Sequence, residues 1–407
     1  MDMNDRSLRD ITIGMGGPGN GYIRQDGFDI SVTSEIMAIL CLASSAEDCR
    51  RRIAAIVVGQ TRERTPVTAR DIGADGAMAA LLKEALNPNL CQTLEHSPAI
   101  IHGGPFANIA HGCSSIRGTM LGLTLSDYCI TEAGFGADLG MEKFLDIKCR
   151  ASSDEDTCDR LSQGPDLVVL VVSLRAVKLH GGHDEPGENL EALKVGMKNV
   201  QRHCENIHKF GLNSIICINK FPMDTEAEVK LASSMCQEFP SVFQVHMANH
   251  WAQGGAGAVD LSKAVINFFE GGGSSNFKFL YPPTLPPLAK LETIAKEIYR
   301  AEGVDVSAAA MATFKKNIMG HPAYEKHISQ WPVCIAKTQY DFSDDAKGNV
   351  AITGKAHTLH VKDFRVCLGA RFIVVLCGDI MTMPGLPKKP AAVDVALDKN
   401  DIVCGLF

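Results

Sequence analysis

Apolar and polar positions in the middle of the chain follow two different periods. Between Glu188 and Phe210, apolar residues recur near helical spacing and stop before Gly211, at Leu190, Leu193, Met197, Val200 and Ile207. This spacing predicts an amphipathic helix. Continuous apolar runs flank it at 166–174 and 215–218 and predict strands. We expect the first of them to be buried on both faces, as strands of parallel sheets are.

A second helix is predicted to run from Asp224 and Thr225 to Phe239. Glu226 and Glu228 lie near its amino end, where the helix dipole favours acidic side chains. Strands that alternate with helices in this way indicate βαβ units. The pattern therefore predicts an α/β fold with a mostly parallel sheet flanked by helices.

Polar, glycine-marked runs interrupt the apolar pattern at five places. They are HGGPFANIAHGC at 102–113, TEAGFGAD at 131–138, VVSLRAVKLHGG at 171–182, NKFPMDTE at 219–226 and WAQGGAGAVD at 251–260. Glycines let backbone N–H groups approach an anionic ligand closely. Ligands of open α/β sheets bind at the carboxyl ends of the strands. The five runs therefore predict one shared crevice.

Glycine and proline also divide the chain. GGGSSNF from Gly271, with YPPTLPP close behind, indicates a domain boundary. Beyond it we expect a helix at Leu288–Tyr299 and strands at Val333–Ala336 and Phe372–Leu376. A G-x-G-x-x-G run at Gly14, Gly16 and Gly19 is discounted as a dinucleotide site, because Pro18 lies inside it and no helical pattern follows.

Composition narrows the class of protein. The net charge of −7 over 407 residues carries no basic block, which argues against a nucleic-acid partner. No apolar run is long enough to cross a bilayer, and the start is charged, unlike a signal peptide. The 14 cysteines form no C-x-x-C pair, and several lie in apolar runs. We therefore expect a cytoplasmic enzyme with no membrane contact, no protein-bound metal and no disulfide framework.

Long motifs in a fixed order carry a family resemblance. The chain resembles formate–tetrahydrofolate ligase over essentially its whole length, in FDISVTSEIMAILCLA, NPNLCQTLEHSPAIIHGGPFANIAHGC, ITEAGFGADLGMEKFLDIKCR, VVSLRAVKLHGG, INKFPMDTEAE and MTMPGLPKKPAA. The resemblance implies a P-loop NTPase-like family fold with further smaller α/β domains. It divides the chain into the remainder of a large ATP-binding domain at 1–127, an α/β domain with ring-binding loops at 128–270 and a carboxyl-terminal domain at 271–407.

The resemblance also implies a reaction. ATP phosphorylates formate to formyl phosphate, and N10 of tetrahydrofolate attacks it to give 10-formyltetrahydrofolate, ADP and phosphate. The implied partners are the small molecules formate, ATP and tetrahydrofolate. Mg²⁺ and a monovalent cation are the implied ions, and the family forms homotetramers. Charge neutralisation and positioning dominate such chemistry.

One family feature is absent. Family members begin with a segment that carries a G-x-x-x-x-G-K-[ST] phosphate- and Mg²⁺-binding loop, and this chain starts after it. The nearest run, Gly348 to Ala356, has the wrong spacing and an alanine in place of the hydroxyl. Because DMNDR after Met1 is internal in the family, a truncated gene model or a fragment is the simplest explanation. The alternative is a non-catalytic paralogue that binds folate or regulates a partner.

The resemblance assigns two aromatic residues to a planar ring. Phe221 and Trp251 match the pair that flanks a pterin or adenine, whose wide faces gain stacking energy. Without the resemblance, either residue is more often part of a core. Asn219 and Asp224 share the loop of Phe221 and are candidates for reading the ring edge. For Asp224, helix capping is at least as good an explanation.

The remaining site residues face the anion. The resemblance suggests that His102, Gly103, Gly104, Asn108 and His111 contact the phosphate or formyl group, with one of the two histidines structural. Arg175 and Lys178, with His111 the catalytic candidates, would stabilise the transferring charge. A solvated or ion-paired face is their ordinary alternative. Departures from the family pattern weaken this anion-binding part, at Val172, Met223, Gln253 and Ala256.

Overall fold

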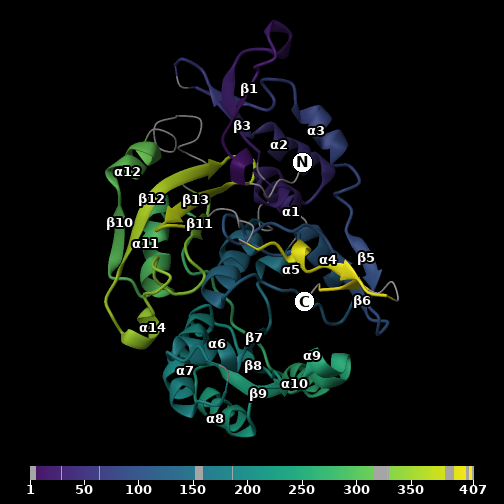
Figure 1. Ribbon diagram of the computed structural model, residues 1–407, viewed down its shortest axis with the longest axis vertical. Coiled ribbons are helices and arrows are strands. Elements are labelled where there is room, and N and C mark those ends of the chain that lie inside the picture. Colours follow the sequence, from purple (N-terminus) through teal and green to yellow (C-terminus); the bar gives the residue numbers. More distant parts are fainter. Residues whose placement is uncertain are drawn as a thin grey trace. The chain divides into compact units, whose positions relative to one another are not determined.

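The computed structural model describes residues 6–28, 30–63, 65–151, 159–185, 187–315, 328, 330–380, 389–399 and 403–405. The chain forms two compact units. One consists of the chain ends, 1–34 with 381–407, and the other of residues 35–380 (Figure 1). The division into 1–127, 128–270 and 271–407 stays a prediction.

The unit of the chain ends contains two short antiparallel ribbons. β1 (Ile11–Ile13) pairs with β2 (Arg24–Asp26), and β14 (Ala396–Leu397) pairs with β15 (Val403–Cys404). The short helices η1 (Arg6–Leu8), η2 (Pro18–Asn20), η3 (Ser31–Thr33) and η9 (Ala391–Val393) complete it. The G-x-G-x-x-G run lies in the β1–β2 connection. The short helix η2 begins inside the run, and β2 follows it.

The first part of the larger unit is helical with two ribbons. Its helices are α1 (Glu35–Leu42), α2 (Ala46–Ala54), α3 (Asp75–Leu81) and α4 (Ile116–Leu125). The ribbons pair β3 (Val57–Gln60) with β4 (Pro66–Thr68) and β5 (Asn89–Gln92) with β6 (Pro98–Ile101). The β5–β6 hairpin leads directly into the glycine-rich loop, residues 102–113.

A three-stranded parallel sheet, in the order β7-β8-β9, forms the middle of this unit. Its strands are β7 (Val168–Val172), β8 (Ser214–Asn219) and β9 (Val242–Ala248). α6 (Leu174–His180), α7 (Leu190–Lys209) and α8 (Glu226–Cys236) share a core with Ile216 and Ile218 of β8 (Figure 1). The predicted parallel sheet and both predicted helices are confirmed. α9 (His250–Gln253), η7 (Gly254–Ala258) and α10 (Val259–Glu270) follow β9.

The prediction that the run 166–174 is buried on both faces is wrong. β7 is an edge strand of the sheet among the described residues, and the side chains of Val169 and Val171 are 37% and 61% exposed. The run also changes structure part-way, because Ser173 accepts a hydrogen bond from the N–H of Ala176 and begins α6. An apolar run reports that a segment is apolar, but not whether a neighbouring strand covers it.

A second, mixed sheet follows residue 270. Its order is β10-β12-β13-β11, with β12 antiparallel to β13 and the two outer pairs parallel. The strands are β10 (Gly303–Val306), β11 (Val333–Ala336), β12 (Thr358–Cys367) and β13 (Phe372–Cys377). The accompanying helices are α11 (Pro287–Glu297), α12 (Ala308–Phe314) and α14 (Val350–Thr353). The fold is thus α/β, as predicted, with one parallel sheet flanked by helices and one mixed sheet.

A buried helical segment at 137–151 connects these parts, and α5 (Asp159–Ser162) lies after it. It contains two π-helical stretches, Ala137–Met141 and Phe144–Cys149. π-Helical turns are rare and occur frequently at functional sites. Several charged side chains of this segment are fully buried: Glu142, Lys143, Asp146 and Lys148.

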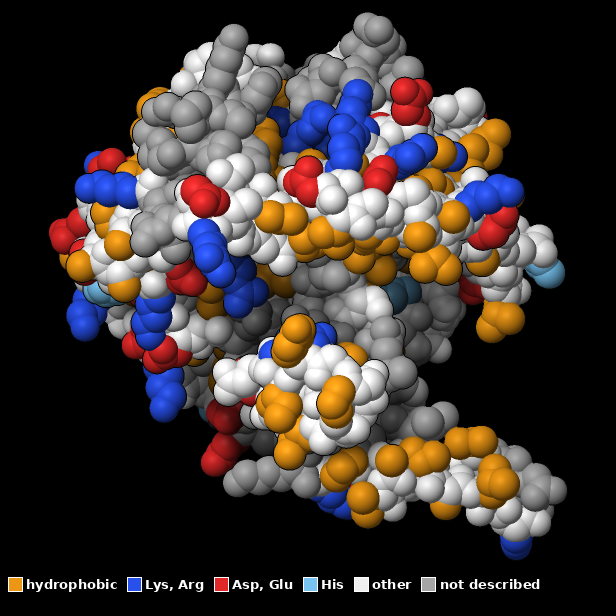
Figure 2. Space-filling model, turned by 90° about the horizontal axis from the view of Figure 1, so that it is seen from above, with side chains coloured by type: hydrophobic (Ala, Val, Ile, Leu, Met, Phe, Trp, Pro, Cys, Tyr) orange, Lys and Arg blue, Asp and Glu red, His pale blue; other side chains and the backbone are white. Residues whose placement is uncertain are grey.

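The surface carries charges of both signs. Figure 2 shows Lys, Arg, Asp and Glu side chains scattered over the face drawn there, with apolar side chains exposed between them. Among the described residues, no helix combines the length and the apolar character needed to cross a bilayer.

Candidate functional site

Two loops of the predicted crevice lie at the same edge of the parallel sheet. β8 ends at Asn219 and β9 at Ala248, and these two residues are register partners. The N–H of Lys220 donates to the carbonyl of Ala248 at 3.0 Å, so the loops leave the sheet together. Phe221 follows in one loop and is partly exposed, and Trp251 follows in the other with 68% of its surface exposed. Such exposure leaves aromatic faces available to a ligand. We call this pair the ring platform.

The polar neighbours of the platform differ in their environment. The Asp224 carboxylate accepts the backbone N–H of Phe221 at 2.8 Å and so holds the turn that carries this aromatic side chain. Thr225, not Asp224, caps α8, in a capping box with Glu228. The side-chain oxygen of Asn219 is buried and has no hydrogen-bond partner among the described residues. Asn219 therefore keeps an acceptor for a ligand at the strand end.

Arg175 and Lys178 lie on α6, one strand away from the platform. Arg175 is exposed, and no partner for its guanidinium is found among the residues that the structure describes. Lys178 is 5% exposed, and its Nζ donates to Glu228 Oε1 at 2.8 Å and to the carbonyl of Gly187 at 2.7 Å. Of the two cations, Arg175 is thus the one whose charge is available to an added anion.

The glycine-rich loop is anchored at its start. His102 is buried, with Nδ1 2.5 Å from Ser115 Oγ and Nε2 2.8 Å from the carbonyl of Ala85, so both ring nitrogens have partners. Gly103 has φ 70°, and a Cβ there would lie 2.2 Å from Cys41 Sγ, so only glycine fits. A Cβ at Gly104 would meet open space, and Asn108 is partly exposed. His102 therefore holds the start of the loop in place.

His111 is buried like His102 but lacks its hydrogen bonds. Its side chain is fully buried, and neither ring nitrogen has a hydrogen-bond partner among the described residues. Burial, together with the positive charges of Lys148 and Lys143, lowers the pKa of His111 to about 3. The imidazole is therefore neutral at physiological pH, with one donor and one acceptor unused. Buried polar atoms without partners are uncommon and mark candidate functional sites.

Cations of the buried helical segment surround this part of the loop. Lys143 Nζ donates to the carbonyl of Ala107, and Lys148 Nζ donates to Thr119 Oγ1 at 2.7 Å. Burial lowers the pKa of Lys148 and raises the pKa of Glu142, which the neighbouring Asp146 raises further. Two buried lysines, Lys143 and Lys148, thus lie close enough to His111 to act on its charge.

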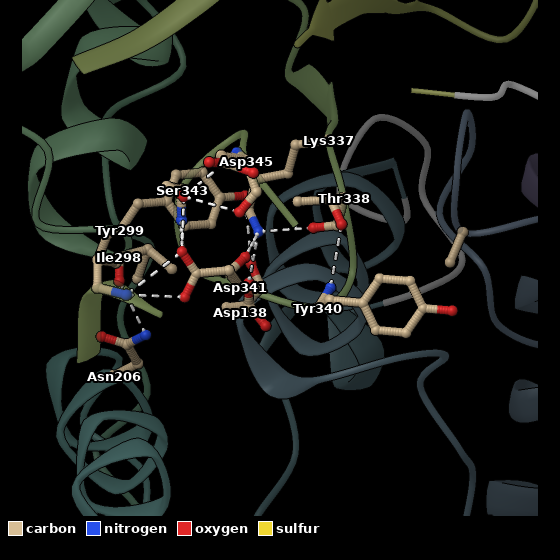
Figure 3. Close-up of polar contacts among 12 residues, drawn as sticks. Asp138, Asn206, Ile298, Tyr299, Lys337, Thr338, Tyr340, Asp341, Ser343 and Asp345 are labelled. Carbon is tan, nitrogen blue, oxygen red and sulfur yellow. Dashed lines mark hydrogen bonds and ion pairs between the residues drawn. The ribbon is translucent and has the colours of Figure 1, made fainter. Parts of the chain in front are cut away.

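A polar network not anticipated from the sequence joins this segment to the mixed sheet. Lys337, fully buried after β11, donates its Nζ toward Asp138 Oδ2 at 3.1 Å and to the carbonyls of Thr338 and Asp341 (Figure 3). Asp341 in turn accepts from Ser343 Oγ at 2.6 Å and from the N–H of Val350 at 3.1 Å. Charged residues in a loop are usually exposed to solvent, so the sequence does not predict the burial of Lys337 and Asp341.

The structure brings the five glycine-marked runs together in two groups. In the first, the N–H of Gly134 donates to the carbonyl of Gly112 at 3.0 Å, which joins 102–113 to 131–138. In the second, 171–182, 219–226 and 251–260 follow the neighbouring strands β7, β8 and β9. The β5–β6 hairpin that precedes 102–113 contacts 251–260 through Glu95, whose carboxylate accepts the N–H of Gly255 at 2.8 Å.

Comparison with known proteins identifies the family. The model of the family "Formate--tetrahydrofolate ligase" matches residues 1–407. The chain is similar to the formate–tetrahydrofolate ligase of Methylibium petroleiphilum, with 50% identity over the whole chain and 70% of that protein. It is 49% identical to those of Granulibacter bethesdensis, over 68% of that protein, and Pelagibacter ubique, over 70%. The chain belongs to this family.

Membership of the formate–tetrahydrofolate ligase family confirms the resemblance carried by the motifs. The role of each site residue stays a prediction, for Phe221 and Trp251 as for Arg175, Lys178 and His111. Sequence reasoning did not find Glu95, Lys143, Lys148 or Lys337 as parts of the site. Their one shared signal is proximity in sequence to the glycine-marked runs or, for Lys337, to a strand end.

Proposed function

We propose that this chain takes part in ATP-dependent ligation of formate to tetrahydrofolate, giving 10-formyltetrahydrofolate, ADP and phosphate. One observation carries the proposal. In a chain about 50% identical to formate–tetrahydrofolate ligases, the two aromatic residues of the ring platform follow register-paired strands at the same end of the sheet, with Trp251 exposed and Phe221 partly exposed. For the complete site we propose the P-loop NTPase-like fold of the family. We further propose that the protein works in the cytoplasm as a homotetramer.

In this proposal the ring platform holds the pterin. Two aromatic faces on a heteroaromatic ring gain stacking energy and exclude water, while Asn219 offers a buried acceptor to the ring edge. Asp224 acts here mainly by fixing the turn of Phe221. Holding tetrahydrofolate in one orientation places its N10 for attack and removes much of the entropic barrier.

The anion is handled by the other group of residues. Formyl phosphate is the intermediate we propose, and its charge suits the cationic interior around Lys143 and Lys148. Neutral His111 is suited to donate one hydrogen bond or accept one, without adding a full charge. Arg175 is free to approach the phosphoryl group from α6. Mg²⁺ and ATP would be held by a phosphate-binding loop, which the 407 residues do not contain.

Tryptophan fluorescence tests the platform. The chain has two tryptophans, Trp251 in the platform and Trp331, which packs against the core. Tetrahydrofolate should quench the emission, Trp251→Leu should abolish the change, and the matched control Trp331→Phe should leave it. Equal loss from both variants, or no quenching at all, would contradict the assignment.

An activity assay provides a second test of the proposed function. With ATP, formate and tetrahydrofolate, the 407-residue chain alone should form no 10-formyltetrahydrofolate above background, because nothing in it fits the γ-phosphate and Mg²⁺ loop. Fusion to the family's amino-terminal phosphate-binding segment should give activity, and Arg175→Ala in that fusion should slow it markedly. Robust turnover by the chain alone would show that another part of it replaces the loop.

A further inference from the structure

The β5–β6 hairpin contacts the loop that carries Trp251. Its tip, Thr93 to Ser97, is held by three hydrogen bonds: the N–H of Thr93 to the carbonyl of Ser97 at 2.9 Å, the N–H of His96 to the carbonyl of Thr93 at 2.9 Å, and the N–H of Ser97 to Thr93 Oγ1 at 3.1 Å. His96 has φ 64°, which closes the turn tightly. The tip is therefore an ordered support, from which the side chain of Glu95 reaches across 160 residues of sequence to Gly255.

The contact is close on both sides. Glu95 Oε1 accepts the N–H of Gly255 at 2.8 Å. A Cβ at Gly254 would lie 2.6 Å from Oε1 of Glu95, and a Cβ at Gly255 would lie 2.0 Å from Oε2. Gly254 also has φ 58°. The carboxylate thus occupies the space that side chains would fill at Gly254 and Gly255. We call these two residues the glycine turn.

The glycine turn directly follows α9, the short helix that carries Trp251. α9 is one turn long, its amino end has no side-chain cap, and Gly254 ends it. Besides its own hydrogen bonds, the loop is closed by the N–H of Asn249 donating to the carbonyl of Gly257 at 3.0 Å. So short a helix is not stable by itself. An external carboxylate bonded to the turn behind it therefore restrains the indole that it presents.

The same hairpin continues into the anion-binding part of the site. β6 ends at Ile101, and the next residue is His102, which is anchored on both ring nitrogens. One ribbon therefore connects the glycine-rich loop to the ring platform. The paired strands run in register from Asn89↔Ile101 to Gln92↔Pro98 between these two ends.

We propose that Glu95 is a positioning residue for tetrahydrofolate: its carboxylate fixes the glycine turn and thereby the orientation of Trp251. The inference rests on the proposed function for its ligand, but the contact itself can be measured without any ligand. Loss of the contact should weaken tetrahydrofolate binding about fivefold, the effect of one ordinary hydrogen bond, because solvent at this exposed tip weakens the bond to the charged group.

Two measurements on the Trp331→Phe background test this, because Trp251 is then the only tryptophan. Hydrogen exchange of the peptide 249–258 should become faster in Glu95→Ala without ligand, and tetrahydrofolate titration followed by Trp251 emission should give a higher Kd. Leu94→Ala is the matched control, since its side chain lies at the same tip and is fully exposed. It should change neither measurement.

A double-mutant cycle makes the test specific. Gly255→Ala should weaken binding because its methyl group meets the carboxylate, and Glu95→Ala should relieve part of that loss. Additive effects, or unchanged exchange in Glu95→Ala, would overturn the role of Glu95. If the parent protein does not bind tetrahydrofolate, the proposed function fails, while the exchange measurement still decides whether Glu95 holds the turn.

Discussion

At the scale of single residues, His111 shows how burial sets chemistry. In the folded protein His111 has a pKa of about 3, whereas in the unfolded chain it has the ordinary histidine pKa of 6.5. Between these two values the unfolded state binds the extra proton, so the free energy of unfolding falls as pH falls. Its contribution is fully present above pH 6.5 and is lost progressively on acidification.

We therefore expect His111 to lower the free energy of unfolding of the wild-type protein by roughly 2–3 kcal/mol between pH 6.5 and pH 4.5. Urea unfolding at the two pH values should show this loss, and His111→Leu should lack it. His96→Asn is the control, because His96 is exposed and asparagine tolerates its left-handed backbone. The buried carboxyls Glu142 and Asp146, whose pKa values are raised, titrate with the opposite sign, so the comparison with His111→Leu is essential. An equal acid loss in that variant would contradict the argument.

At the scale of elements, one buried ion pair joins two helices and the start of a third. Lys178 of α6 meets Glu228 of α8, and Glu228 also accepts the N–H groups of Thr225 and Asn189, the residues that precede α8 and α7. Burial alone would raise the pKa of Glu228, but these bonds outweigh it and lower the pKa. The carboxylate therefore stays charged and fixes three helix ends.

Removing one partner should be costly. Lys178→Met leaves Glu228 charged and unpaired, and we expect a loss of about 3–5 kcal/mol in the free energy of unfolding. Exposed Arg175→Ala should stay within about 0.5 kcal/mol. Denaturant unfolding of Lys178→Met with Glu228→Leu should recover part of the loss. Equal stabilities for Lys178→Met and Arg175→Ala would show that the pair is not a structural support.

Individual helices and strands were far easier to predict from the sequence than the contacts that each makes with other parts of the fold. Helical spacing predicted α7 and α8, and apolar runs predicted β8, β11 and β13, because local periodicity depends on which face is buried. β7 was placed correctly as a strand, but its exposure at the sheet edge depends on strand order, which no local pattern contains. Glu95 and Lys337 were missed for the same reason: their partners, Gly255 and Asp138, lie 160 and 199 positions away in the sequence.

At the scale of the whole molecule, the exposed edge of the parallel sheet is a liability. Val169 and Val171 of β7 are exposed, and so are Tyr128 and Ile130 on the segment after α4. An edge strand with apolar side chains is a template for pairing with other chains. We expect the chain to bind a hydrophobic dye and to self-associate as its concentration rises.

A charge on the edge should suppress this behaviour. Val171→Lys should reduce dye fluorescence and association, measured by light scattering, because a lysine on an exposed edge strand opposes pairing. Leu81→Lys, on exposed α3, is the matched control for added charge and should have little effect. A monodisperse wild-type protein without dye binding would show that the edge is protected.

The first helix of the larger unit is completed by its last strands. Glu35, at the start of α1, accepts the N–H groups of Gly369 and Ala370 at 2.6 and 3.1 Å, across 334 and 335 residues of sequence. The main core likewise contains residues from Ala38 to Cys377. At synthesis rates of about 5–20 residues per second, α1 leaves the ribosome tens of seconds before these partners exist. Throughout that interval its apolar face depends on chaperones or on transient contacts. The protein is therefore most vulnerable to aggregation during its synthesis.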